Sequence, residues 1–129
     1  MNDVFLQIFN RLTIDLNPVL VYDYIPQDLK DDDYPYTQIG SIDTVNDDTD
    51  SETGFEASVQ VTSYSRYRGL KEINQLSGFI YQSLNHWRIL NTATHSIGDI
   101  TQISQTTIVA PDGLTRISVQ SFRLYFEPL

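Results

Sequence analysis

The feature that most constrains the fold is the stretch over residues 69–87, GLKEINQLSGFIYQSLNHW. Its apolar residues recur at steps of three and four, at Leu70, Ile73, Leu76, Ile80, Leu84 and Trp87. At about 100° per residue, these positions fill one side of a helix, as in a helix that packs against a core. Gly69 suits the start of such a helix and Asn91 its end. The pattern therefore predicts a long amphipathic helix around which the other elements pack.

Phe79 departs from this pattern, because it lies opposite the apolar stripe on the polar side of the predicted helix. A single exposed phenylalanine is common on protein surfaces. The ring can also contact a loop of the same chain or a second subunit. We therefore take Phe79 as a candidate residue of a subunit interface.

Shorter patterns before this helix predict one further helix and three strands. Apolar residues share one face over residues 3–12, which predicts an amphipathic helix. Residues 19–25 predict a short strand, and a second strand is expected to begin after Pro35. Gly40 within it predicts a bulge or a close backbone approach. Alternation of polar and apolar residues from Glu56 to Thr62 predicts a strand over residues 55–64 with one buried and one wet face.

After the helix, residues 91–99 predict a polar connection, and residues 100–109 and 115–126 predict two long strands. The turn Ala110-Pro111-Asp112-Gly113 between them favours a hairpin, because each of its last three residues suits a turn position. The last strand has apolar residues on both faces. We expect one α+β domain over residues 1–129, with two helices on one face of a mainly antiparallel sheet that ends in a long β-hairpin.

The negative charge is concentrated in one segment. The net charge of the chain is −9. The segment from Asp28 to Glu56 contains ten acidic residues and one lysine, so it accounts for the whole excess of negative charge. Within it, residues 43–54 are turn formers and acids, so we expect a mobile acidic loop. Such a surface repels the nucleic-acid backbone and argues against specific DNA or RNA binding. No apolar run is long enough for a membrane span, and no secretory signal is recognised.

The sequence carries no recognisable catalytic motif, and we expect neither an enzyme nor a cofactor. A phosphate-binding loop, a dinucleotide-binding glycine motif, a serine-nucleophile elbow and a zinc-protease motif are all missing. There is no cysteine for thiol chemistry or zinc binding. Of the two histidines, His86 is expected on the polar face of the helix and His95 in a loop.

A calcium site is the alternative of another class. Asp48, Asp50 and Glu52 alternate as at the start of a calcium loop. Such a loop needs glycine at its sixth position and glutamate at its twelfth, where this chain has Thr53 and Val59. The pattern therefore fails, although an acidic calcium-dependent binding module stays open as a hypothesis.

Arg66 and Arg68 alternate with tyrosines just before the helix. Arginine beside aromatic rings can stack on nucleic-acid bases, but two arginines are few for that purpose. They are better suited to packing at the helix start, or to salt bridges with the Asp28–Glu56 segment of a neighbouring subunit. The candidate interface residues are therefore Phe79, Arg66, Arg68, Asp47, Asp48, Asp50 and Glu52.

The order of five short pieces resembles a known family. These are VYDYIP, PYTQIGS after an acidic spacer, FEASVQVTSYS after an acidic loop, the helix ending in QSLNHW, and the closing hairpin. Over about residues 19–126 the chain is similar to the tail completion, or tail terminator, proteins of long-tailed bacteriophages of the SPP1-like and HK97-like group. Ile25 stands where the family more often has valine.

The resemblance implies a structural protein of the virion, made and assembled in the host cytoplasm. Its relatives form a six-membered ring at the head-proximal end of the tail tube. The ring stops polymerisation of the major tail tube protein and offers a docking surface to the head-completion protein of the neck. Phage DNA passes through the lumen without specific binding, and no membrane is involved. Another head–tail connector protein of the neck is the nearest alternative.

Overall fold

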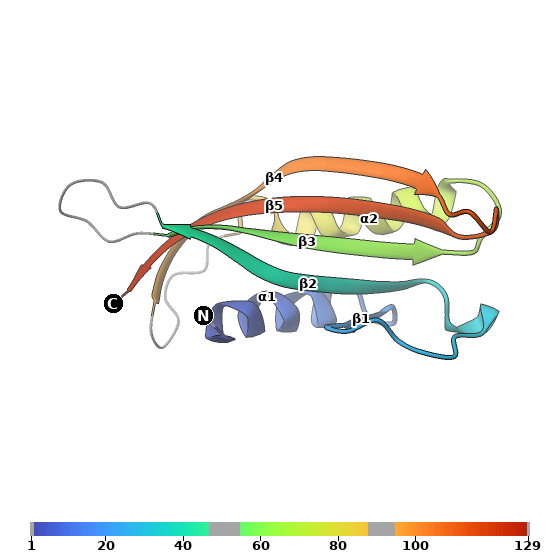
Figure 1. The fold of residues 1–129 in the computed structure, drawn as a ribbon, viewed down its shortest axis with the longest axis horizontal. Coiled ribbons are helices and arrows are strands. Elements are labelled where there is room, and N and C mark those ends of the chain that lie inside the picture. The colour runs from blue at the N-terminus through green and yellow to red at the C-terminus, as the bar shows by residue number, and fades with distance from the viewer. Residues whose placement is uncertain (1, 47–54, 88–94, 129) are drawn as a thin grey trace.

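A computed structural model describes residues 2–46, 55–87 and 95–128 of the chain. In chain order its elements are the helix α1 (Asn2–Asp15), the strand β1 (Leu20–Tyr22), the 3-10 helix η1 (Asp31–Asp33), the strands β2 (Tyr36–Asn46) and β3 (Phe55–Ser65), the helix α2 (Lys71–Leu84), and the strands β4 (His95–Val109) and β5 (Arg116–Pro128). Figure 1 shows both α-helices on the same side of one long sheet. Neither has the length and apolar character that a membrane crossing requires.

The five described strands form one sheet in the order β1-β2-β3-β5-β4. The short strand β1 runs parallel to β2, and every other neighbouring pair is antiparallel. The strands β4 and β5 form the closing hairpin (Figure 1). The expected α+β class, the mainly antiparallel sheet and the terminal hairpin are therefore confirmed.

One apolar core joins both helices to the same face of the sheet. The stripe of α1 contributes Val4, Ile8 and Leu12, all fully buried, and α2 contributes the predicted Leu76, Ile80 and Leu84. The sheet contributes alternate residues of its central strands, among them Ala57, Val59, Val61, Phe122 and Leu124. These side chains all point toward the helices, and neither α-helix lies on the opposite side of the sheet. We call that side the helix-free face.

A bulge in β2 keeps its apolar residues in the core. The register with β3 shifts between Ile39 and Ile42, as the glycine at position 40 predicts. Ile39 pairs with Val61 and Ile42 with Val59, so three positions along β2 match two positions along β3. Without the extra residue, the alternation of a strand would turn Ile42 to the helix-free face.

Two segments expected outside strands belong to strands. Residues 43–46 continue β2, with Asp43 paired to Ser58, and residues 95–99 begin β4. Both segments are rich in turn-forming residues, so local propensity favoured a loop or connection. Pairing with a long neighbouring strand outweighs that propensity, because it satisfies the backbone donors and acceptors of the whole segment. The rest of the expected acidic loop, residues 47–54, lies outside the described residues.

The helix α2 (Lys71–Leu84) is shorter than the predicted 69–87 at both ends. Leu70, expected in the apolar stripe, lies before the helix and is 50% exposed. At the other end Asn85 is the capping residue, instead of Asn91, and its side-chain oxygen accepts from the Gln102 N–H at 2.9 Å. His86 follows with φ 60° and donates its N–H to the Ile100 carbonyl. His86 is thus beyond the helix instead of on its polar face.

Polar groups in the interior join α2 to β5. The Ser77 hydroxyl contacts the Ser118 hydroxyl at 2.7 Å and the Ile73 carbonyl at 2.8 Å. The buried Gln120 amide donates to the Ser77 carbonyl and to the Gln102 side chain. Buried polar groups of this kind stabilise only the arrangement in which their partners meet. They therefore fix the position of α2 on the sheet.

Candidate interface surfaces

Arg66 lies at the end of the sheet where the β4–β5 turn, η1 and the β3–α2 turn come together. Its Nη1 donates to Asp31 Oδ1 at 2.7 Å, and its Nε donates to the Thr115 hydroxyl at 3.2 Å. Its guanidinium carbon is 4.4 Å from the centre of the Tyr34 ring. The bonded Asp31 carboxylate raises the pKa of Arg66. The arginine therefore holds three separate segments at this end, which we call the hairpin end.

Asp112 fixes the turn of the hairpin. Its carboxylate accepts from the backbone N–H groups of Thr115 and Leu114 and from the Thr115 hydroxyl, at 2.8–2.9 Å. These hydrogen bonds, together with Arg66 at 3.9 Å, lower the pKa of Asp112 below its ordinary value. The predicted turn residues thus form the turn, and the aspartate side chain holds its shape.

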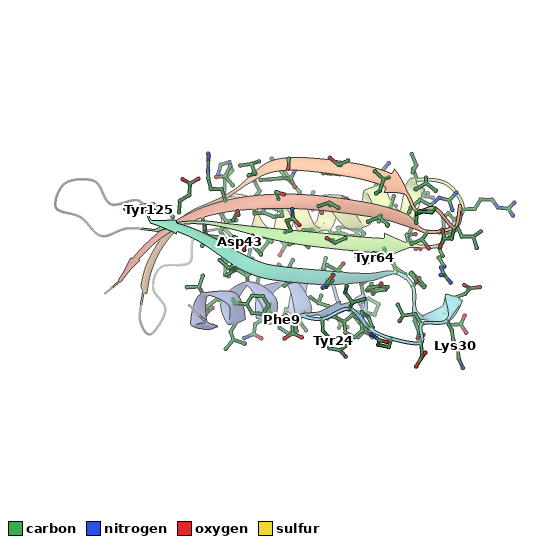
Figure 2. All side chains as sticks on the ribbon, viewed as in Figure 1. Phe9, Tyr24, Lys30, Asp43, Tyr64 and Tyr125 are labelled. Carbon is green, nitrogen blue, oxygen red and sulfur yellow. The ribbon has the colours of Figure 1, made fainter. Side chains whose placement is uncertain are left out.

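Tyrosine rings cluster beside Arg66 on the helix-free face. Tyr36 and Tyr64 face each other across β2 and β3 with ring centres 4.7 Å apart. Tyr34 and Tyr22 contact the Tyr36 ring, at 5.2 and 5.8 Å. Burial within this cluster raises the pKa of Tyr36 and of Tyr64. Figure 2 shows Tyr64 near the hairpin end of β3. Sequence reasoning missed this cluster, although the four tyrosines at positions 22–36 were a compositional signal for it.

A cavity of about 300 Å³ opens next to Arg66. It is lined by Asp31, Tyr34, Arg66, Tyr67, Glu72 and Leu114. The wall contains side chains of positive and negative charge and two aromatic rings. Of the charged groups, Glu72 accepts a hydrogen bond from the Ser65 hydroxyl at 2.8 Å. The cavity is therefore a polar recess at the hairpin end, with its charged groups already paired in part within the chain.

The opposite end of the helix-free face carries one described ion pair, between Arg123 of β5 and Glu56 of β3 at 3.7 Å. A cavity of about 240 Å³ is lined there by Glu56, Thr101, Arg123, Leu124 and Tyr125. Both charged side chains are about half exposed, so the pair is weak. Asp43 and Tyr125 mark this end in Figure 2.

The sequence-predicted interface residues do not come together in one place. Phe79 is 58% exposed on α2, on the side opposite its buried residues. Arg66 contacts Asp31 of the acidic segment, but within its own chain, and Arg68 is exposed nearby. Asp47, Asp48, Asp50 and Glu52 lie outside the described residues. A role for these side chains between subunits stays a prediction.

Metal-ligating residue types do not gather in the described part of the chain. Over residues 2–46, 55–87 and 95–128, no group of three histidine or acidic side chains is placed to hold a metal ion. His86 is exposed, and His95, expected in a loop, begins β4. The architecture defines a small α+β domain whose sheet carries both α-helices on one face.

Comparison with known proteins narrows this class to one family. The family model described as tail completion protein gp17 matches residues 10–127, so the chain belongs to the tail completion protein family. The resemblance drawn from the sequence is therefore confirmed. A protein of this family is a structural component of the phage virion.

A solved structure has the same fold. It is a chain of the virion of a native gene transfer agent particle, with a TM-score of 0.78 at 12% sequence identity. The match covers 93% of this chain and 91% of that chain. At this identity the similarity concerns the fold alone. No match was found among curated proteins.

Proposed function

We propose that this protein is a tail terminator that forms a six-membered ring at the head-proximal end of the tail tube. There the ring stops polymerisation of the tube protein and presents a surface to the neck. The observation that carries the proposal is the family match over residues 10–127. The fold shared with a chain of a gene transfer agent virion supports it.

The helix-free face suits a ring through which DNA passes. The middle of its central strands β3 and β5 presents hydroxyl and amide side chains, namely Ser58, Gln60, Thr62 and Ser121. Its described charges are few, and Arg123 is paired with Glu56. A surface with no cluster of free cations in its described part gives phosphate groups little to bind. We therefore propose that this face lines the lumen, where DNA slides without specific binding.

A terminator performs no reaction, and we propose that this chain has no enzymatic activity. Its partners would be further copies of itself, the major tail tube protein and a head-completion protein of the neck. The acidic residues 47–54 are proposed to contact one of these partners. The ends of the sheet, with the polar recess beside Arg66 at one of them, are suited to face tube and neck.

Binding to isolated virus parts tests the proposal. Purified protein is added to tails from a virus that lacks this gene, and the product is imaged by electron microscopy. The expected result is added density at one end of each tail. Density at the portal vertex of the heads, with bare tails, would identify a neck connector instead.

Deletion of the gene provides an independent test. We expect tails of uncontrolled length, or complete heads and tails that fail to join. Virions of normal length and infectivity from the deletion strain would overturn the proposed function. Restoring the gene on a plasmid controls for effects on neighbouring genes.

A further inference from the structure

The outer strands β1 and β4 lie at opposite edges of the sheet (Figure 1). Among the described residues each pairs with a single strand. The outer side of β4 bonds to the chain after α2 at Ile100 and Gln102, so the segment considered on this strand is Ser104–Val109. Natural sheets guard such edges with charged side chains or prolines, because an open edge is a template for another strand. Neither Leu20–Tyr22 nor Ser104–Val109 contains a charged residue or a proline.

The exposed part of β4 is also regular. Its register with β5 shifts before Ser104 and then continues unbroken from Ser104 to Val109. Bulges are a common way of spoiling an edge for pairing. The last six residues of β4 have none, so their outward backbone groups keep the spacing that a further strand needs.

Leu20 and Ile108 lie at the two ends of one row across the sheet. Successive pairings run from Leu20 to Tyr36, Tyr64, Ile117 and Ile108. The next two rows likewise run from β1 to β4. The free segment of one edge is thus level with the free segment of the other, measured along the strands.

These row ends are also chemically matched. Leu20 is 60% exposed and Ile108 is 50% exposed. Directly paired residues of a sheet share a face, so both belong to the helix-free face with Tyr64. Two apolar side chains brought opposite each other across a strand pair stabilise it. Each edge therefore offers an exposed apolar side chain that the side chain of the other edge can contact.

We propose that copies of this chain join edge to edge, with β1 of one copy beside β4 of the next and Leu20 opposite Ile108. The inference rests on the proposed ring and specifies its joint. Following the strand directions, β4 runs opposite to β1. A rotation about an axis along the strands preserves direction, so the joint is antiparallel. Because Leu20 and Ile108 lie at the same height along the strands, joining them does not shift one copy along the strand direction relative to the next. An interface without such a shift favours a closed ring over a filament.

Cross-linking tests this joint directly, because the chain has no cysteine of its own. Leu20→Cys and Ile108→Cys are made singly and together, and treated with a short bis-maleimide, both in concentrated solution and on tails capped by the variant. The double variant should give a ladder of dimers and larger species on a denaturing gel. A mixture of the two single variants should give dimers only.

Controls separate the joint from chance contacts and from other interfaces. The double variant Ile14→Cys/Asn74→Cys carries one exposed cysteine on each α-helix and none on an edge strand, and it should give no ladder. Dimers from Ile108→Cys alone would mean a two-fold contact between β4 strands and would overturn the proposal. The proposal would also be overturned if the Leu20→Cys/Ile108→Cys variant gave no ladder either in solution or on capped tails. Variants that cap tails without cross-linking would refute the joint and leave the proposed function standing.

Charged edges give a second readout. Leu20→Lys and Ile108→Lys each place a cation on one edge, which opposes strand addition. Each variant should lose the ring on its own, whereas an equimolar mixture should form one-to-one dimers through the two intact edges. Ile14→Lys, a matched change on α1, should assemble as the unmodified protein does. Rings from either edge variant would overturn the joint.

Discussion

Arg66 and Asp31 join two segments that lie 35 residues apart in the sequence, with the guanidinium Nη1 donating to the carboxylate Oδ1 at 2.7 Å. The same guanidinium lies over the Tyr34 ring. Arg66→Ala removes both contacts, so we expect residues 28–35 to open more often while the sheet stays folded. Faster amide hydrogen exchange confined to this segment would be the measured result. Arg68→Ala, an exposed neighbour, is the control, and equal exchange in both variants would contradict the role given to Arg66.

Because of Asp112, part of the free energy of unfolding is expected to depend on pH in the acid range. Its pKa is lowered in the folded chain, so folding favours its charged form. The resulting stability is fully present above the ordinary carboxyl pKa of 3.8 and is lost as the pH falls through the lower folded value. We expect Asp112→Asn to unfold more easily than the unmodified protein at neutral pH, and the difference to shrink below about pH 4. Denaturant titrations at several pH values check this, and a difference that does not change with pH would contradict it.

Much of the fold could be predicted because hydrophobic periodicity reports burial directly. The positions Ile73, Leu76, Ile80 and Leu84 were predicted as one stripe and are all buried. Leu70 follows the same spacing yet is exposed, because Gly69 with φ 89° directs the chain into the helix only after it. Spacing indicates which residues share a face, but backbone geometry decides where the helix begins.

The surface sites were harder to predict, because their partners are distant in the sequence. Arg66 was expected to pair with the acidic segment of a neighbour, and the structure pairs it with Asp31 of its own chain. The tyrosine cluster and the row from Leu20 to Ile108 depend on the strand order and register of the sheet. Neither can be derived from local patterns, since a shift of one residue would reverse every face.

Ile80 is the strongest test of the core. It is fully buried between α2 and the sheet. Ile80→Asp places an unpaired charge there, and we expect a loss of several kcal/mol, comparable with the about 5–15 kcal/mol of a typical domain. Loss of the cooperative transition in circular dichroism would be the result. Tyr81→Asp, on the exposed side of the same helix, should cost about 0.5 kcal/mol or less. Similar unfolding of both variants would contradict the predicted division between the two helix sides.

A substitution at Phe79 tests assembly independently of folding. Its ring is more than half exposed on α2, so Phe79→Asp should leave the domain folded with an unchanged circular dichroism spectrum. If the ring lies at a subunit contact, desolvating the new carboxylate opposes association, and sedimentation should shift toward smaller species. Gln75→Asp adds the same charge to the exposed side of α2 without removing an aromatic ring. A sedimentation profile of Phe79→Asp that matches the unmodified protein would exclude this residue from the interface, leaving the β1 and β4 edges to hold the copies together.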